Sequence, residues 1–154
     1  MYKRQSYHIV YNETLRDRVC AVSNKTHYNE MNVLSMHALI GAYQPQGDEW
    51  VDELNQVLAG NIEYFCDYVD EHFEGVSYSR PQGTYMVFLD CTEWCREHGR
   101  DIQRLLDEGA RVGVGYQDGR PFHGPCHIRV NLALPLSRVR EACDRLDRYV
   151  FNAR

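Results

Sequence analysis

Apolar residues in the first half of the chain recur at the spacing of helices. Residues 13–22 form the first predicted helix, which Asn12 can cap through its side chain. Residues 30–43 are apolar nearly all round, which is typical of a buried helix. A short strand is predicted over residues 6–11, and a polar loop over residues 23–29 joins the two helices.

A longer helix is predicted over residues 48–74. Asp48 can cap this helix, acidic residues follow in its first turn, and Gly75 ends it. Its apolar residues return every three or four positions, so they form one stripe that needs burial. The stripe consists of Trp50, Leu54, Val57, Leu58, Ile62, Phe65, Val69 and Phe73.

The second half of the chain alternates strands with helices. The predicted strands are residues 75–80, 84–90, 112–116 and 126–134, and the predicted helices are residues 92–99, 101–109 and 137–151. Ser137 can cap the last helix, whose apolar residues share one face. We expect an α+β fold: a small, mostly antiparallel sheet flanked by helices, preceded by the long helix, with the long and last helices covering one face.

The composition is that of a globular domain. The 154 residues are 44% hydrophobic and carry a net charge of -5, which argues against nucleic acid or an anionic membrane as the main partner. The sequence has no run of 18 apolar residues and no long apolar stretch near its start, so we expect neither a membrane span nor a secretory signal. The six cysteines are then expected to be reduced thiols of a cytoplasmic protein.

Cysteine and histidine residues in the second half suggest two kinds of chemistry. Cys91 and Cys95, with His98, offer soft ligands for zinc, although no second pair with zinc-site spacing follows. Cys126 near His123 is a conceivable nucleophile and base, without an orienting third group. The glycines of "GVGYQDG" lack the spacing of a dinucleotide-binding loop. We favour structural thiols and ordinary turns, and expect no metal site.

The stretch "PCHIRVNLALP" places one arginine in the middle of an apolar strand. Ile128 and Val130 would face the core, while Arg129 and Asn131 would point to the opposite face. An arginine there can keep its head in water while its stem packs on the strand. It can also grip a carboxylate through two parallel hydrogen bonds, because a strand holds the guanidinium rigidly. The pattern alone leaves both interpretations open.

Two motifs in combination resemble the C-terminal part of a class I/II aminotransferase, and more narrowly the cystathionine β-lyase-like branch of fold-type I pyridoxal-phosphate enzymes. The stretch "RPQGTYMVFLD" resembles the family's P-x-G-T-Y motif and the strand after it. The stretch "IRVNLALP" resembles the family's (I/V)-R-(L/V/M)-N-x-A-x-P motif. The resemblance runs from about Ser6 to the C-terminus. The matching residues are Pro81, Gly83, Thr84, Tyr85, Ile128, Arg129, Val130, Asn131, Ala133 and Pro135.

The resemblance implies roles for two residues of the predicted strand. Arg129 would bind the α-carboxylate of an amino-acid substrate, and Asn131 would support the strand or its loop. The parent enzyme would be a homodimeric, pyridoxal-phosphate-dependent aminotransferase or C–S β-lyase acting on amino acids. Residues 1–46 would be the edge of its large domain with a helical linker, and residues 47–154 the α+β C-terminal small domain.

The chain departs from the family at the residue that performs the chemistry. The family uses a lysine that forms a Schiff base with the cofactor, and an acidic partner for the pyridine nitrogen. Lys3 and Lys25, the two lysines here, stand outside the family's lysine motif. The resemblance therefore implies that this chain supplies no catalytic or cofactor-binding residue and is inactive alone. The alternative is a free-standing α+β ligand-binding or interaction module without catalysis.

We therefore expect the purified chain not to bind pyridoxal phosphate specifically. Without the family's lysine, no Schiff base of the cofactor should survive dialysis. Visible absorbance after incubation with the cofactor and dialysis measures this. A stoichiometric band that persists in wild type and Lys3→Ala but disappears in Lys25→Ala would contradict the expectation.

Overall fold

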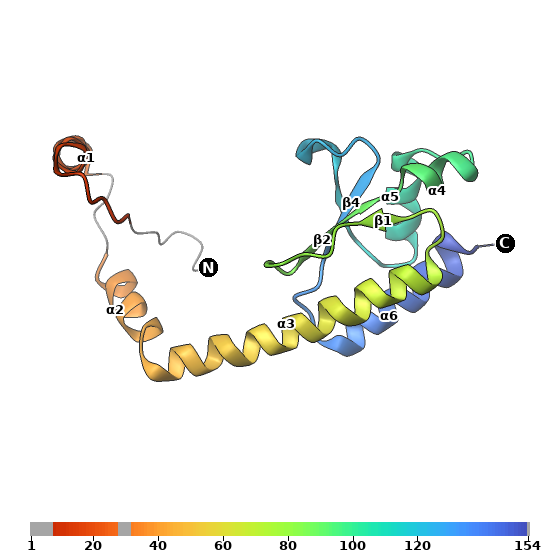
Figure 1. Cartoon of the computed structure of the whole chain (residues 1–154), viewed down its shortest axis with the longest axis horizontal. Helices are drawn as coiled ribbons and strands as arrows, with labels where there is room; N and C mark the ends of the chain where they lie inside the picture. The colour runs from red at the N-terminus through yellow and green to blue at the C-terminus, as the bar shows by residue number, and fades with distance from the viewer. Residues whose placement is uncertain (1–7, 28–31, 154) are drawn as a thin grey trace. The chain divides into compact units, whose positions relative to one another are not determined.

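The computed structural model describes residues 8–27 and 32–153, which belong to two compact units, Met1–Asp52 and Glu53–Arg154. Figure 1 traces the helices and strands of both units along the chain. The first unit contains α1 (Glu13–Thr26), α2 (Val33–Ala42) and the beginning of α3 (Pro45–His72). The predicted domain boundary between residues 46 and 47 stays a prediction.

The first unit has the predicted helices but not their predicted burial. Asn12 caps α1 as expected, because its Oδ1 accepts a hydrogen bond from the Leu15 N–H at 2.9 Å. The helix then continues to Thr26, so the loop predicted from residue 23 onward was wrong as far as this residue. The apolar sequence of α2 predicted a buried helix, yet α2 has no buried residue, and Leu34 is 83% exposed. An apolar helix is buried only where another element covers it.

The strand predicted over residues 6–11 does not form in the part of that stretch that the structure describes. Ser6 and Tyr7 lie outside the described residues, and residues 8–11 have no regular secondary structure. A strand needs a neighbour that satisfies its backbone hydrogen bonds. No strand among residues 8–27 and 32–153 pairs with this segment, and its Ile9 is 69% exposed.

The second unit contains an antiparallel sheet of four strands in the order β1-β2-β4-β3. The strands are β1 (Ser77–Tyr78), β2 (Met86–Asp90), β3 (Gln117–Asp118) and β4 (His127–Asn131). The longest pairing joins β2 to β4, from Met86 opposite Asn131 to Asp90 opposite His127. The predicted α+β class and antiparallel sheet are therefore confirmed.

Helices cover one face of this sheet, and α3 and α6 run side by side beneath it (Figure 1). The further helices are α4 (Thr92–Glu97), α5 (Ile102–Arg111) and α6 (Leu136–Leu146), which continues as a π-helical turn (Asp147–Phe151). The predicted apolar face of the last helix is confirmed, because Val139, Cys143, Leu146 and Val150 are all buried in one core. Among the described helices, none has the length and apolar content required to cross a bilayer.

Two helices have a proline at their start, and neither is capped by the predicted side chain. The first helical residue of α3 is Pro45, so Asp48 lies within its first turn and does not cap it. Proline suits that position because its ring presets the backbone angle and no partner is needed for its missing N–H. Pro135 precedes α6, and Ser137 lies inside that helix, so its hydroxyl makes no capping bond.

The strand predicted over residues 112–116 is wrong. This stretch forms turns and irregular backbone, and the two-residue β3 pairs with β4 instead. Alternating valine and glycine favoured a strand, but Tyr116 packs on α5 and donates a hydrogen bond to the Leu105 carbonyl at 2.5 Å. Gly109 permits this approach, since a Cβ there would lie 2.5 Å from the tyrosine ring. Packing of one aromatic side chain therefore overrode the local strand preference.

A buried asparagine ties α3 to the chain that leaves β4. Asn61 is 1% exposed, and its side-chain amide donates hydrogen bonds to the carbonyls of Leu132, at 2.8 Å, and Leu134, at 2.7 Å. Both carbonyls lie in the irregular segment between β4 and α6. The asparagine therefore gives this turn the hydrogen bonds that a neighbouring strand would otherwise supply.

We expect Asn61→Ala to lower the free energy of unfolding by about 1–3 kcal/mol, because one buried and one partly buried carbonyl lose their donor. Urea denaturation measures the change. Asn55→Ala is the matched control, since Asn55 lies exposed on the same helix and the gain in helix propensity is the same. Equal unfolding midpoints for the two variants would show that the amide contributes no net stability.

Candidate functional site

The face of the β2–β4 pair opposite the core carries polar and aromatic side chains. Residues of the two strands alternate between this face and the core, so Ile128 is buried while its neighbours are half-buried. We call this side the open face. Its residues are Met86, Phe88 and Asp90 of β2, and His127, Arg129 and Asn131 of β4.

Arg129 lies at the centre of the open face, opposite Phe88 of β2 and Gln117 of β3. Its guanidinium carbon lies 4.1 Å from the ring centroid of Phe122, which is a cation–π contact. Its Nε is buried and has no hydrogen-bond partner. Within residues 8–27 and 32–153, no carboxylate forms an ion pair with Arg129. The strand therefore holds a positive charge that no described carboxylate neutralises.

The stacking ring belongs to a tight loop between β3 and β4. The backbone N–H groups of Phe122 and Gly124 both donate to the Gly119 carbonyl, at 2.8 and 3.1 Å. Glycine is needed at both ends of this loop, because a Cβ on Gly119 would lie 2.5 Å from the His127 carbonyl oxygen, and one on Gly124 would lie 2.5 Å from the Phe88 ring. The loop therefore lies flat on the open face and presents its aromatic ring to Arg129.

An ion pair at the start of the loop fixes its conformation. The Arg120 Nε donates to Asp118 Oδ2 at 2.7 Å, and the Arg120 backbone N–H donates to Asp118 Oδ1 at 2.9 Å. A further bond runs from Arg120 Nη2 to Gln103 Oε1 of α5, at 2.9 Å. The side-chain hydrogen bond from Arg120 holds the pKa of Asp118 below its ordinary value, because this bond favours the charged form of the carboxylate.

A histidine and an aspartate share the open face with Arg129. His127 Nε2 lies 3.8 Å from Asp90 Oδ2, and the His127 ring packs on Phe88 with 4.6 Å between ring centroids. Burial acts to raise the pKa of Asp90, but hydrogen bonds from the hydroxyl and backbone N–H of Thr92 more than offset it and lower the pKa. The Asp90 carboxylate therefore interacts with Thr92 and His127, and it forms no ion pair with Arg129.

Asn131, the second predicted site residue, points to the same face as Arg129 but makes a local bond. Its Oδ1 accepts a hydrogen bond from the Ala133 N–H at 2.8 Å, which closes the turn after β4. It also lines a hollow of about 370 Å³ between β4 and α6, to which Arg129 does not contribute. The structure thus puts both residues on one strand face and does not bring them into one pocket.

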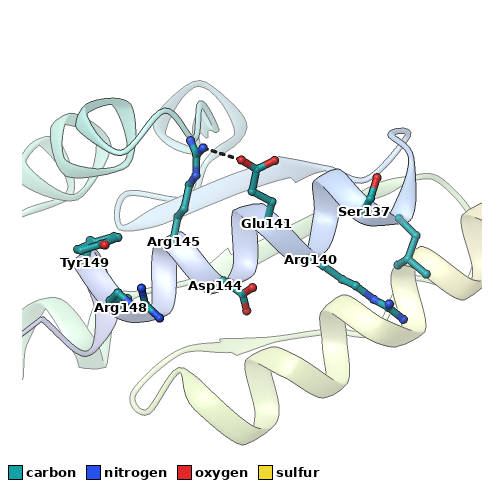
Figure 2. A pocket seen from close by; sticks show the side chains of 8 residues that line it. Ser137, Arg140, Glu141, Asp144, Arg145, Arg148 and Tyr149 are labelled. Atoms are coloured by element: carbon teal, nitrogen blue, oxygen red, sulfur yellow. Dashed lines mark hydrogen bonds and ion pairs between the residues drawn. The ribbon is translucent and has the colours of Figure 1, made fainter.

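A second hollow, of about 650 Å³, follows the outer side of α6 (Figure 2). All three arginines that line it are exposed. Arg145 pairs with Glu141 at 2.6 Å, Arg140 lies over the Tyr64 ring at 5.1 Å, and Arg148 lies over the Tyr149 ring at 5.8 Å. Arg129 is instead half-buried on a paired strand, and its Nε is buried without a partner, so we place the candidate site there.

Four of the six cysteines, Cys66, Cys91, Cys95 and Cys143, are buried thiols. Burial raises the pKa of the Cys91 thiol and raises that of Cys95 to about 12, so both stay protonated and unreactive at neutral pH. No group of three metal-ligating side chains occurs among residues 8–27 and 32–153. The zinc interpretation of these cysteines therefore gains no support. All six cysteines are free thiols.

Sequence reasoning missed Phe122, Asp118 and Arg120, which together shape the surroundings of Arg129. The stretch "QDGRPFHGP" was identified only as a loop. The available signal was a pair of glycines five residues apart that bracket an exposed phenylalanine, 45% exposed in the structure. Such bracketing is typical of a tight loop that approaches other backbone closely.

Comparison with known proteins gives consistent results. The profile of the family described as aminotransferase class I and II matches residues 6–146. A Mycobacterium leprae protein named as a cystathionine beta-lyase is 32% identical over 130 residues, which cover 70% of this chain and 30% of that protein. The chain therefore spans about a third of the length of its curated relatives.

Solved structures share the fold. An aminotransferase from Clostridium difficile with pyridoxal phosphate bound gives a TM-score of 0.79 at 22% identity, covering 90% of this chain and 35% of that chain. A C–S lyase from Staphylococcus hominis with the same cofactor gives 0.75 at 23% identity, covering 90% and 36%. At these identities the likeness shows the fold and not a shared substrate.

We expect Arg129→Ala to change the stability of the chain by less than about 1 kcal/mol, because the arginine loses one cation–π contact with a half-exposed ring and no ion pair. Thermal unfolding measures the change, with the buried neighbour Ile128→Ala as the reference that should cost about 2–5 kcal/mol. A loss for Arg129→Ala as large as for Ile128→Ala would identify the arginine as a structural tether.

Proposed function

Because the chain belongs to the class I and II aminotransferase family, we propose that Arg129 binds the α-carboxylate of an amino-acid substrate in a pyridoxal-phosphate-dependent aminotransferase or C–S β-lyase. The observation that supports this most directly is the guanidinium itself, which lies on the open face, stacked on one side and unpaired with any described carboxylate. Arg129 differs in this respect from Arg120 and Arg145, whose guanidinium groups pair with carboxylates of the same unit.

The donors of Arg129 suit a carboxylate. Its Nε is buried, so the two terminal nitrogens remain for a ligand, and their fixed fork matches the two oxygens of a carboxylate. A strand paired on both sides holds this fork more rigidly than a loop would. Binding the carboxylate fixes the orientation of the amino acid, which is the contribution of this chain's residues to any reaction at its α-carbon.

The family's cofactor would be held by residues other than those of the open face. Pyridoxal phosphate, when bound, withdraws electrons from the amino acid joined to it and needs a lysine for attachment. Lys25 lies exposed in α1 of the first unit, and Lys3 lies outside the described residues. The open face offers no lysine to the cofactor, so we assign this chain the substrate carboxylate and not the cofactor.

We further propose that the parent protein supplies a large domain with the cofactor site and forms a homodimer. The chain spans only about a third of its relatives' length. The exposed apolar residues of α2 support this proposal, because such a surface is stable in water only when a partner covers it. Its large exposed residues are Val33, Leu34, Met36 and Ile40.

The proposed role predicts that the chain binds simple carboxylates through Arg129. Titration with acetate should shift the Arg129 Nε–Hε signal in proton–nitrogen NMR spectra, whereas acetamide should leave it in place, since the neutral amide lacks the charge. Arg129→Ala should abolish saturable binding, and Arg129→Lys should restore only part, because lysine lacks the planar fork.

Arg148→Ala is the matched control for this titration, since Arg148 also lies over an aromatic ring but away from the sheet. An acetate response that survives Arg129→Ala would reject the proposed site. In the parent enzyme, the same substitution should weaken amino-acid binding by about 2–4 kcal/mol, the usual cost of truncating one partner of a desolvated charge pair. Unchanged substrate binding there would reject the proposed role.

A further inference from the structure

We infer that Phe122 is a positioning residue for Arg129, and that its ring orients the guanidinium for a carboxylate. This inference rests on the proposed function of Arg129. The contact that carries it is the stack of the guanidinium carbon over the Phe122 ring at 4.1 Å, next to a buried Nε without a partner.

The Phe122 ring orients the guanidinium of Arg129, as an ion pair orients the guanidinium of other arginines in this chain. Arg120 is oriented by Asp118 at 2.6 Å and Arg145 by Glu141, also at 2.6 Å. A carboxylate partner would orient Arg129 equally well, but it would also neutralise the charge and occupy the donors. An aromatic face orients the guanidinium plane while it leaves the terminal N–H groups to a ligand.

Phe122 is itself held in place rather than packed in the core. Its side chain is 45% exposed and its residue lies in the short 3₁₀ turn Arg120–Phe122. The next residue, His123, adopts a left-handed backbone with φ of 63°, and the loop closes by the bond from the Gly124 N–H to the Gly119 carbonyl. A half-exposed ring on so constrained a loop contributes little to core packing, so its removal should affect Arg129 more than the fold.

The Asp118–Arg120 pair extends this support to α5 through Gln103. The loop is thereby fixed at both ends, by this pair before Phe122 and by the packing of Gly124 on Phe88 after it. These contacts restrain the loop backbone and so keep Phe122 beside Arg129. The guanidinium consequently loses less rotational freedom on binding than an unsupported arginine would, which favours binding.

The stack can be measured before any ligand is added. The Phe122 ring current should shift the Arg129 side-chain protons to lower frequency in the proton NMR spectrum, and Phe122→Leu should remove that shift while the amide signals of β2 and β4 stay in place. Arg129 protons at ordinary frequencies in the wild-type chain would overturn the inference without reference to any variant.

Ligand binding is then compared between variants by acetate titration. Phe122→Leu should weaken acetate binding about two- to fivefold, the factor that corresponds to an exposed cation–π contact. Phe122→Tyr should bind as wild type, because it keeps the aromatic face. Tyr149→Leu is the matched control, since it removes the ring under Arg148 and should change nothing.

The outcomes separate the two proposals. Absence of any Arg129-dependent acetate response in the wild-type chain overturns the proposed function, whereas the ring-current measurement still decides whether the stack exists. Equal acetate affinity in wild type and Phe122→Leu, with the ring-current shift lost, overturns the positioning role and leaves Arg129 as the binding residue. If Phe122→Leu disturbs the amide signals of the sheet, Phe122→Met takes its place in both measurements. Weaker acetate binding by Phe122→Tyr than by wild type would also overturn the inference.

Discussion

The pairing of β2 with β4 determines which side chains of this sheet meet the core and which meet a ligand. Five residue pairs, from Met86–Asn131 to Asp90–His127, set the register. Because side chains alternate along a strand, a slip of one residue would bury Arg129 and expose Ile128. Ile128 and Leu89 are buried in the core, and this excludes the slip. A slip would remove apolar side chains from the core and bury charged ones in their place. The position of the candidate site is therefore a consequence of core packing.

Polar contacts then restrain the segments on either side of β4, whose facing is already set by the strand register. Asn61 secures the chain just after β4, and the Asp118–Arg120 pair secures the loop just before it. Each contact consists of direct hydrogen bonds. Each restrains a connecting segment next to β4 that is not itself a strand of the sheet. Arg129 thus lies on a strand whose two connections are both restrained, although neither restraint contacts it directly.

The sequence predicted those elements whose own pattern decides their structure. The apolar stripe of α6, the cap at Asn12 and the strand around Phe88 all follow from local spacing and residue type. The exposure of α2 and the absent strand at residues 112–116 depend instead on which surfaces a segment meets. A single sequence does not encode that information locally.

The candidate site divides in the same way. The charge that interrupts an apolar strand drew attention to Arg129, but that pattern left its role open, and the role was inferred from the resemblance to a family. Its aromatic partner is seven positions earlier in a loop, where no periodicity links the two. Only the glycine-dependent folding of residues 119–124 onto the open face brings them together. Sequence patterns therefore located the charge and could not identify what orients it.

The strand order has a consequence for synthesis on the ribosome. β4 lies between β2 and β3 in the sheet, although it is made last. Until it emerges, β3 has no neighbour and β2 has only the two-residue β1, so this sheet cannot close before β4 is made. A nascent chain interrupted before residue 127 would lack the central strand and Arg129 together. Its β1, β2 and β3 segments would accordingly stay exposed to proteases.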